Sequence, residues 1–298
     1  MDVSRVLVLG GTGMLGHAVW GTCRERFDAY ATVRADELGG AAAEVLDAER
    51  TVTGVLIEEP RSIARALDET KADAVVNCIG VVKQAVDDPA VAIRANALFP
   101  HELAAACRER GARLIHVSTD CVFSGRRGGY AESDVPDPVD LYGRSKLLGE
   151  PAIPGALTIR TSMIGREIST SHGLLEWFLS QSGGSVRGFT RAVFSGPTTP
   201  VLSRAIADVI ERHEELEGLW HVGAEPIDKH RLLALLRDAF DVDTEIEADD
   251  GVVIDRSLDS SRFRDATGWS PPAWEEMVTE LAETAEEYAN VRQGLARR

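Results

Sequence analysis

A tyrosine and a lysine stand four residues apart in the segment Tyr142-Gly143-Arg144-Ser145-Lys146. On a helix this spacing places the phenol and the ammonium on one face, one turn apart. A nearby positive charge lowers the pKa of a phenol, so Tyr142 could give or take a proton near neutral pH. The spacing predicts a proton-transfer pair, although Tyr-x-x-x-Lys strings also arise by chance.

Polar side chains follow the apolar run that precedes this pair. The run Leu114–Val117 leads directly into Ser118, Thr119 and Asp120. If the run is a strand of an open parallel sheet, these side chains lie at its carboxyl end, where ligands bind. We expect Thr119 to hydrogen bond the substrate oxygen beside Tyr142, the alternative being an ordinary turn at the end of a strand.

A glycine-rich segment near the N-terminus predicts a second binding function. It spans Gly10–Gly16, directly after the apolar run Val6–Leu9, and opens an amphipathic stretch that extends to about Glu25. Glycine lets the backbone approach a pyrophosphate, and a helix N-terminus supplies N–H groups and a positive dipole end. We expect the loop to bind a dinucleotide diphosphate. The residues assigned to this contact are Gly10, Thr12, Gly13, Met14, Leu15 and Gly16.

The end of the next expected strand, Ala29–Val33, bears on the identity of the dinucleotide. A carboxylate there would favour NAD(H), whereas this chain has Arg34, which can pair with a 2′-phosphate. Asp36 and Glu37 follow at once, so Arg34 can instead be a solvated residue that pairs with them. We favour NADP(H) over NAD(H). Asp47 is expected to accept a hydrogen bond from the adenine amino group or to be a turn aspartate.

Short apolar runs alternate with longer amphipathic stretches over the first half of the chain. This alternation predicts an α/β fold with a Rossmann-type, doubly wound parallel sheet. We expect strands at Val6–Leu9, Ala29–Val33, Ala74–Cys78, Arg113–Ser118 and Ala156–Arg160. We expect helices at Gly13–Glu25, Ser62–Glu69, Val91–Arg110 with an interruption at Pro100, and Leu141–Leu148.

The rhythm changes after Arg160 and predicts a smaller C-terminal α/β lobe. We place a dinucleotide-binding domain at residues 1–164 and a substrate lobe at 165–298, with a helix at about 200–214 packing back on the first domain. The helices expected in this half are Leu174–Leu179, Val201–His213, Lys229–Phe240 and Trp274–Tyr288, and the strands are Leu219–Val222 and Thr244–Glu247.

Composition argues against several classes of partner. The 298 residues include 32 Lys and Arg against 48 Asp and Glu, a net charge of −16 that repels nucleic acid and anionic lipid. The cysteines show neither a CxxC pair nor metal-ligand spacing with histidine, which predicts reduced thiols and no metal site. No apolar run is long enough for a signal peptide or a membrane span, so we expect a soluble cytoplasmic protein.

Several motifs occur in a fixed order along the chain. They are Gly10–Gly16, Asn77-Cys78-Ile79-Gly80, Ser118-Thr119-Asp120-Cys121-Val122-Phe123-Ser124-Gly125, Tyr130-x-Glu132-x-Asp134 and Tyr142-Gly-x-Ser-Lys146-x-x-Gly149-Glu150. Together they resemble the extended short-chain dehydrogenase/reductases, and within them the dTDP-4-dehydrorhamnose reductase group. The resemblance is specific over about residues 4–165. Beyond, it rests on Pro197-Thr198, Gly218-x-Trp220-His221-Val222, Leu258-Asp259 and Gly268-Trp269-x-Pro271.

The resemblance implies a set of site residues. Thr119, Tyr142 and Lys146 would form an active-site trio, with Lys146 also binding the nicotinamide ribose. Asn96 matches an asparagine associated with the active site and its water. The residues that would line the cofactor site are Cys78, Ile79 and Gly80.

The resemblance also implies a reaction. Similar proteins reduce the 4-ketone of nucleotide-linked 4-keto-6-deoxy sugars with NADPH or NADH. We therefore expect hydride transfer to the C4 carbonyl of such a sugar with Tyr142 as proton donor, in surface polysaccharide or deoxysugar biosynthesis.

The expected substrate contacts include positions that depart from the group. Cys121 stands where an aromatic residue is usual, and Phe194-Ser195-Gly196 stands where a Gln commonly precedes Pro-Thr. Both positions face the sugar in similar proteins, so the nucleotide and the sugar remain open. The residues we expect to contact the substrate are Cys121 and Phe123 at the sugar, Lys83 nearer the sugar, and Arg187 and Arg191 at the diphosphate. Each of these cations can instead be a solvated surface charge.

Two other readings remain open. One is a nucleotide-sugar 4-epimerase or dehydratase with recycled NAD, although a dehydratase typically carries Asp-Glu where this chain has Asp120-Cys121. The other is a non-catalytic NADPH-binding partner, since the regulatory subunit of methionine adenosyltransferase resembles the same group. The presence of Thr119, Tyr142 and Lys146 together favours catalysis. A homodimer is compatible with the fold, but no motif fixes its interface.

Overall fold

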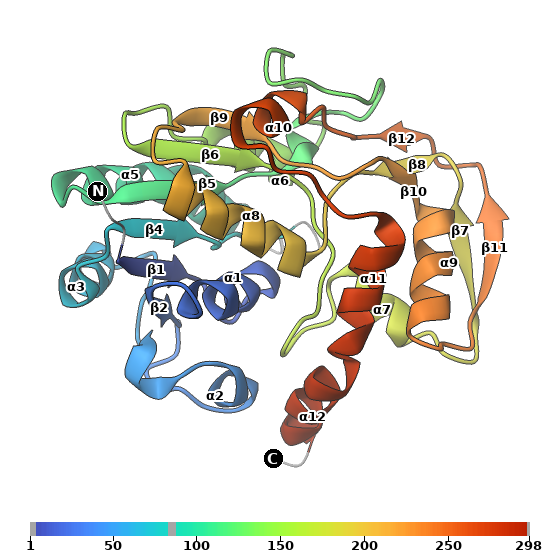
Figure 1. Ribbon diagram of the computed structural model, residues 1–298, viewed down its shortest axis with the longest axis horizontal. Coiled ribbons are helices and arrows are strands. Elements are labelled where there is room, and N and C mark those ends of the chain that lie inside the picture. The colour runs from blue at the N-terminus through green and yellow to red at the C-terminus, as the bar shows by residue number, and fades with distance from the viewer. Residues whose placement is uncertain (1–3, 83–87, 297–298) are drawn as a thin grey trace.

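The computed structural model describes residues 4–82 and 88–296 and contains a seven-stranded sheet (Figure 1). The strand order is β3-β2-β1-β4-β5-β6-β9, and every neighbouring pair is parallel. This confirms the expected Rossmann-type sheet. The strands are β1 (Arg5–Leu9), β2 (Asp28–Thr32), β3 (Thr51–Val52), β4 (Ala74–Asn77), β5 (Arg113–Val117), β6 (Ala156–Arg160) and β9 (Gly218–His221).

Both faces of the sheet are apolar because its strands consist of consecutive apolar residues, whose side chains point alternately to one face and the other. In β1, Val6 and Val8 join one core with α1 (Met14–Arg24) and α8 (Thr199–Arg212). Leu7 and Leu9 join another core on the opposite face. Its helices are α3 (Pro60–Thr70) and α5 (Phe99–Glu109). Because all the strands are parallel, their carboxyl ends lie along one edge of the sheet, and the helices on the two faces hold the sheet in place.

The second lobe packs short strands around helices (Figure 1). Its core includes Phe178, Leu233 and Met277. The helices are α7 (Leu174–Leu179), α9 (Lys229–Ala239) and α11 (Trp274–Glu283). The strands are β7 (Ser185–Phe189), β8 (Ala192–Phe194), β10 (Ile227–Asp228), β11 (Glu245–Asp249) and β12 (Ile254–Asp255). The sequence pattern predicted β11 alone among these strands, because two- to five-residue strands carry little periodicity.

The remaining elements are short, except for the C-terminal helix. They are α2 (Ala41–Val45), α4 (Pro89–Ile93), α6 (Leu141–Leu148), α10 (Ser261–Thr267) and α12 (Ala285–Ala296), with helical turns η1 (Ala48–Arg50), η3 (Arg94–Leu98) and η4 (Asp120–Val122). The expected terminal helix is divided at Thr284 into α11 and α12. Among the described residues, no helix combines the length and apolarity needed to cross a membrane.

The two halves of the chain are interleaved. Helix α8 packs against α1, and β9 pairs with β6 as an outer strand of the large sheet. Helix α12 returns to α2 in the first half, as the lower part of Figure 1 shows. The domain boundary between residues 164 and 165 stays a prediction. Strand β9 and helix α8 come after this boundary in the chain but belong to the large sheet and its covering helices.

The helix expected at Val91–Arg110 is interrupted before Pro100, not at it. Proline has no N–H group to donate to the carbonyl of Asn96, four residues earlier. The chain forms the π-helical turn η3 there, in which the Phe99 N–H bonds to the Arg94 carbonyl. The turn carries Asn96 into the interior, where its side chain is fully buried.

Candidate active site

Thr119 lies just beyond the carboxyl end of β5 and is almost fully buried. Its hydroxyl oxygen accepts a hydrogen bond from the Cys121 N–H at 3.1 Å, which caps η4. The same hydroxyl donates to Asp120 Oδ1 at 3.2 Å. These bonds hold Thr119 at the sheet edge where ligands bind in this type of fold.

Helix α6 places Tyr142 beside Thr119. Asp140 caps the helix by accepting from the Gly143 N–H at 2.9 Å. A Cβ atom at Gly143 would lie 2.2 Å from the Cys121 carbonyl oxygen, so only glycine allows α6 to approach η4 this closely. The approach permits a hydrogen bond between the side chains of Tyr142 and Thr119.

Lys146 follows one turn later and is 4% exposed. Its ammonium donates to the Val117 carbonyl at 2.7 Å, at the last residue of β5. Burial lowers the pKa of Lys146 to about 8, against the opposing charges of Glu150 and Cys78. The ammonium therefore remains mostly protonated at pH 7, next to the end of the strand.

The pKa of Tyr142 moves opposite to the expectation. Burial is the largest cause and raises this pKa above that of an ordinary phenol, with Cys121 and Asp120 acting in the same direction. The hydrogen bond with Thr119 lowers it by less. The prediction of a lowered Tyr142 pKa is wrong for this structure, because removal from water disfavours the charged phenolate. A phenol with a raised pKa keeps its proton at neutral pH and can only be a donor there.

Asn96 connects three segments around the trio. Its Oδ1 accepts from the Val81 N–H and its Nδ2 donates to the Val81 carbonyl, both at 2.9 Å. Nδ2 also donates to Ser145 Oγ in α6 at 3.2 Å. A Cβ atom at Gly80 would lie 3.8 Å from Lys146 Nζ, so this segment borders the lysine. Asn96 positions the segment after β4, and its expected link to a water stays a prediction.

A buried ion pair behind the trio was missed in the sequence. Arg160, at the end of β6, donates through Nε and Nη2 to the two oxygens of Glu150, each at 2.8 Å. Ser118 Oγ donates to Glu150 Oε1 at 2.7 Å. The Arg160–Glu150 ion pair, together with Ser118, thus connects the ends of β5 and β6 to the segment after α6. Glu150 could have been selected from the sequence, because it ends the motif that contains Tyr142 and Lys146. No spacing in the sequence indicated that its partner is Arg160.

The structure corrects the assignment of Phe123 to the sugar. Its side chain has no exposed surface. Its ring stacks on the ring of Tyr130, with 4.2 Å between the two centroids. The Arg160 guanidinium lies 5.2 Å from the centre of the Phe123 ring. An aromatic residue enclosed in this way supports the loop after η4. Cys121, in contrast, is half-buried and acts electrostatically on Tyr142.

The glycine loop has the geometry of a phosphate cradle. Gly10 has φ +80°, and a Cβ atom at Gly16 would lie 2.0 Å from the Gly10 carbonyl oxygen. Gly13 is the N-cap of α1, with no side-chain cap, and Thr12 is exposed beside it. Uncapped N–H groups at a helix N-terminus suit a diphosphate. The loop therefore fits a dinucleotide.

The segment Cys78–Gly80, which follows β4, borders the same loop. The Cys78 N–H bonds to the Leu9 carbonyl at 3.2 Å. Ile79 Cγ1 lies 3.1 Å from an ideal Cβ position on Gly10. The structure thus brings the segment Cys78–Gly80 against the glycine loop on one side and Lys146 on the other.

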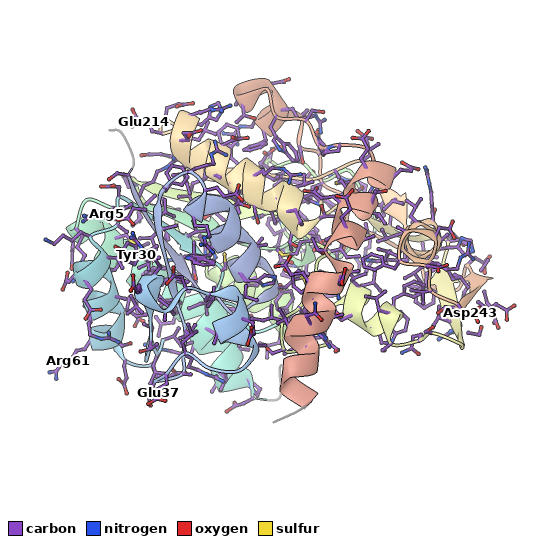
Figure 2. The ribbon with its side chains drawn as sticks, turned by 60° about the horizontal axis from the view of Figure 1, so that its bottom comes forward. Arg5, Tyr30, Glu37, Arg61, Glu214 and Asp243 are labelled. Carbon is purple, nitrogen blue, oxygen red and sulfur yellow. The ribbon has the colours of Figure 1, made fainter. Side chains whose placement is uncertain are left out.

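Arg34 lies in the exposed loop after β2. Glu37, labelled in Figure 2, stands on the outer surface of the same loop. Within the part of the chain that the structure describes, Arg34 forms no ion pair with Asp36, Glu37 or another carboxylate. The alternative pairing is therefore not formed, and the guanidinium remains available to a ligand.

Asp47 is an exposed turn residue. Its Oδ1 accepts from the Glu49 N–H at 2.9 Å and caps η1, as the turn alternative predicted. Contact with an adenine stays a prediction.

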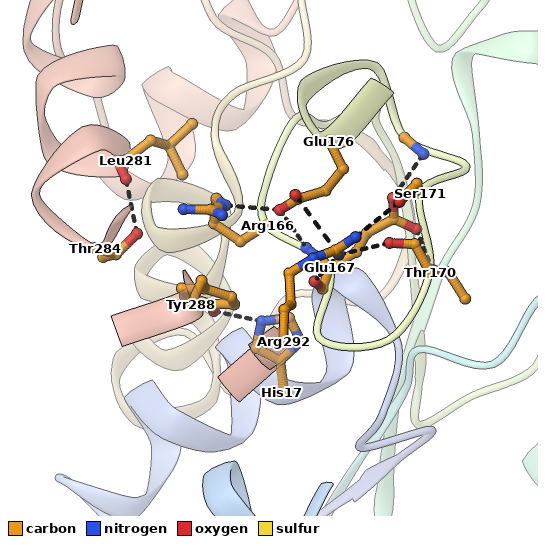
Figure 3. A network of polar contacts seen from close by, with 11 residues as sticks. His17, Arg166, Glu167, Thr170, Ser171, Glu176, Leu281, Thr284, Tyr288 and Arg292 are labelled. Carbon is orange, nitrogen blue, oxygen red and sulfur yellow. Dashed lines mark hydrogen bonds and ion pairs between the residues drawn. The ribbon is translucent and has the colours of Figure 1, made fainter. Parts of the chain in front are cut away.

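The segment after residue 165 lies over the glycine loop. A Cβ atom at Gly173 would fall 2.4 Å from Met14 Cε, in the first turn of α1. The Gly173 N–H donates to Glu167 Oε2 at 2.7 Å. Arg292 of α12 donates to the carbonyls of Glu167 and Thr170, each at 2.7 Å (Figure 3). The C-terminal helix thus holds the segment that covers Met14.

The same helix also contacts α1 itself (Figure 3). His17 Nδ1 lies 2.7 Å from the Gly13 carbonyl and Nε2 lies 2.6 Å from the Tyr288 hydroxyl. A carbonyl only accepts, so Nδ1 carries the proton and Nε2 accepts from Tyr288. Burial lowers the pKa of His17, which keeps the ring neutral. No spacing in the sequence indicated this contact, because its partners are 271 residues apart.

The cations expected at the diphosphate do not join the trio. Arg187 pairs with Asp249 at 3.1 Å across the β7–β11 sheet, and 69% of its side chain is exposed. Asp243, two residues before β11, is labelled at the far tip of the second lobe in Figure 2. Arg191 is exposed in the turn before β8. Lys83 lies outside the described residues.

The chain is similar to a known protein family and to named reductases. The family model described as the RmlD substrate binding domain matches residues 4–287. A probable low-salt glycan biosynthesis reductase of Haloferax volcanii is 32% identical over 230 residues, which cover 73% of this chain and 74% of the relative. A dTDP-4-dehydrorhamnose reductase of Mycobacterium tuberculosis is 34% identical over 184 residues, covering 52% and 60%.

Two further proteins bear on the rival readings and on the fold. Methionine adenosyltransferase 2 subunit beta of Danio rerio is 31% identical over 257 residues, covering 80% of this chain and 74% of that protein. The solved dTDP-4-dehydrorhamnose reductase of Bacillus anthracis, in complex with NADP, has a TM-score of 0.77 at 21% identity. It covers 94% of this chain and 99% of its own, which shows the shared fold.

Proposed function

The chain belongs to the RmlD substrate binding domain family, and from this premise we propose that it reduces a nucleotide-linked 4-keto-6-deoxy sugar at C4. As a member of this reductase family it is an oxidoreductase with a nicotinamide cofactor. The observation that carries the proposal is the meeting of Thr119, Tyr142 and Lys146 beside the glycine loop at one sheet edge. We assign the product to deoxysugar or surface-glycan synthesis, as the name of the Haloferax relative supports.

Tyr142 is the proton donor in this proposal. Reduction of a ketone creates an alkoxide that must take up a proton, and the raised pKa of Tyr142 keeps that proton on the phenol until it is needed. Thr119, which hydrogen bonds with Tyr142, would turn its hydroxyl proton from Asp120 Oδ1 to the carbonyl oxygen and hold that oxygen as its charge grows. A reduced nicotinamide cofactor, with its diphosphate held by the glycine loop, would supply the hydride.

Lys146 stabilises the phenolate that remains after transfer. Its ammonium is fixed on the Val117 carbonyl, one helical turn from Tyr142. A positive charge in a site removed from water interacts strongly with a new negative charge. Lys146 would also hold the ribose hydroxyls of the cofactor, which places both functions on one side chain.

NADP(H) is the cofactor we favour. The support is the exposed Arg34 guanidinium after β2, with no carboxylate paired to it among the described residues. Replacement by Glu should reverse the preference, because a carboxylate repels a 2′-phosphate and accepts from a 2′-hydroxyl. Dissociation constants of NADPH and NADH for wild type and Arg34→Glu measure this. Equal NADPH affinity in both proteins would contradict the assignment.

The function itself is tested with purified protein freed of nucleotide. Oxidation of NADPH and of NADH is followed by absorbance with a panel of dTDP-, UDP- and GDP-linked 4-keto-6-deoxyhexoses. We expect one nucleotide series to be reduced with NADPH preferred. Interconversion of sugars without net consumption of reduced cofactor would instead identify an epimerase.

A regulatory role is the second candidate. The match to methionine adenosyltransferase 2 subunit beta over 80% of this chain favours it. Tight NADPH binding with no sugar turnover in the whole panel would move this role ahead of the reductase. Its direct readout is a change in the kinetics of a methionine adenosyltransferase when this chain is added.

A further inference from the structure

A lysine of the second lobe lies near the trio and was not selected from the sequence. Lys229 is the first residue of α9, after the N-cap Asp228. Its ammonium stands 4.0 Å from the centre of the Phe194 ring, and its side chain is half-buried. Only four lysines occur in the whole chain, so a partly enclosed one is a distinctive feature.

The charges around Lys229 come from the candidate active site. Asp120 and Cys121 are the groups whose charge acts on it, and burial lowers the pKa of Lys229 to about 8 against their effect. Yet Lys229 forms no ion pair with any carboxylate that the structure describes, and the Phe194 ring is its nearest assigned partner. A half-buried ammonium without a paired anion is costly unless a ligand supplies one.

Asp120 is not paired with Lys229 in the part of the chain that the structure describes. It is buried, it accepts from Thr119, and burial raises its pKa. Arg256 is the first of the charges that oppose this rise, with Lys229 also contributing. Lys229 and Arg256, two cations of the second lobe, thus both act on one buried carboxyl group of the first lobe, in a chain of net charge −16.

The backbone fixes this region against the trio. Arg256 Nε donates to the Phe123 carbonyl at 2.9 Å, and the Asp255 N–H donates to the Gly125 carbonyl at 2.7 Å. The Leu258 N–H donates to Ser195 Oγ at 3.0 Å, next to Phe194. These bonds link the second-lobe segments that surround Lys229 to the loop that begins at Thr119.

We propose that Lys229 binds a phosphate of the nucleoside-diphosphate substrate, from the second lobe, in the place expected for Arg187 and Arg191. This inference rests on the proposed function for its substrate class. A substrate whose C4 carbonyl lies at Thr119 and Tyr142 carries its diphosphate on the far side of one sugar ring. Lys229 is a partly enclosed cation of the second lobe, and Asp120 and Cys121, next to Thr119, act on it electrostatically. The Phe194 ring keeps the ammonium in place without neutralising it.

The test compares ligands with and without phosphate. Wild type, Lys229→Met, Lys229→Arg and the control Lys71→Met are titrated by calorimetry with dTDP, UDP and GDP and with the matching nucleosides. Lys71 is exposed at the end of α3, and its replacement removes the same charge. Binding of NADPH and circular dichroism verify that each variant is folded.

We expect Lys229→Met to weaken diphosphate binding by about tenfold or more, since a charged hydrogen bond is lost. Affinity for the nucleoside and for NADPH should stay within about twofold, and Lys229→Arg should restore part of the loss. Unchanged diphosphate affinity, or an equal loss for nucleoside and diphosphate, would overturn the inference.

The outcomes separate this inference from the proposed function. If wild type reduces a 4-keto sugar and Lys229→Met binds the diphosphate as tightly, the inference alone fails. If diphosphate binding depends on Lys229 but no 4-keto sugar is reduced, the proposed function alone fails. If wild type binds none of the diphosphates, both fail.

Discussion

At the scale of single residues, burial sets the protonation of the candidate trio. Tyr142 has its pKa raised and Lys146 has its pKa lowered, because removal from water disfavours the charged form of each. The same effect thus leaves an acid that holds its proton and a cation that can lose one within an accessible pH range. These protonation states are the ones that the proposed proton donation by Tyr142 requires at neutral pH.

The first prediction concerns the pH dependence of catalysis. Lys146 has a folded-state pKa of about 8 and is charged below that value, so the stabilised phenolate and the ribose contact are lost as pH rises through it. Glu150 and Cys78 are the charges that act on it. We expect kcat/KM for reduction to fall above about pH 8 with the slope of one proton. A flat profile to well above pH 9 would contradict the role of Lys146.

A second residue-scale prediction concerns Gly143, whose missing side chain allows α6 to meet η4. Gly143→Ala introduces a Cβ atom 2.2 Å from a backbone oxygen that cannot move away freely. We expect turnover to fall by at least about a hundredfold and the free energy of unfolding to fall by about 1–3 kcal/mol. Kinetics and urea denaturation measure the two effects.

Gly21→Ala is the matched control. This glycine lies within α1, and nothing stands within 4 Å of its ideal Cβ position. Alanine there should leave turnover unchanged and raise the free energy of unfolding by about 0.5–1 kcal/mol. Equal kinetics for Gly143→Ala and Gly21→Ala would show that the close approach of α6 does not matter.

At the scale of elements, helix α12 is the connection between the C-terminus and the cofactor region. It bonds to α1 through Tyr288 and to the segment over Met14 through Arg292. Behind them, Arg166 pairs with Glu176 at 2.7 Å, and both side chains are nearly inaccessible (Figure 3). The network holds the first turn of α1 and its covering segment in one arrangement.

Arg292→Met tests this connection. It removes the hydrogen bonds to two backbone carbonyls of the covering segment, so ordering that segment becomes part of cofactor binding. We expect the NADPH dissociation constant to rise about three- to tenfold while kcat at saturating cofactor changes little. Fluorescence titration and steady-state kinetics give the two quantities.

The control for this helix is another arginine with an exposed partner. Arg231 pairs with Glu275 at 3.2 Å on the surface of the second lobe, and such a pair contributes little. Arg231→Met should therefore leave the NADPH dissociation constant unchanged. A similar rise in both variants would point to a general effect of lost charge.

At the scale of the whole molecule, local patterns predicted the sheet and left long-range contacts unpredicted. Alternating runs gave the parallel strands, since each burial pattern is contained in a few residues. The spacing of Tyr142 and Lys146 placed both on α6, as found. The direction of the Tyr142 pKa shift required knowledge of burial, which depends on segments far apart in sequence.

The surroundings of other side chains could not be predicted from the sequence either. Phe123 belongs to a conspicuous motif, yet packing by Tyr130 and Arg160 encloses it. Arg187 was selected for its charge and its Gly/Ser-rich surroundings. Its partner Asp249 lies 62 residues later in the chain, on the neighbouring strand. The surroundings of Lys229 could not be predicted because they combine Phe194 of β8 with Asp120 and Cys121 of η4, which are far apart in the sequence.

The central claim is that Tyr142 donates the proton in reduction of a nucleotide-linked 4-keto sugar. The most direct measurement is single-turnover oxidation of NADPH by wild type and Tyr142→Phe with the sugar that wild type accepts, alongside NADPH titration of both. We predict a rate lower by roughly a hundredfold to ten-thousandfold in Tyr142→Phe, with an NADPH dissociation constant within about twofold of wild type. Undiminished turnover in Tyr142→Phe would contradict the account.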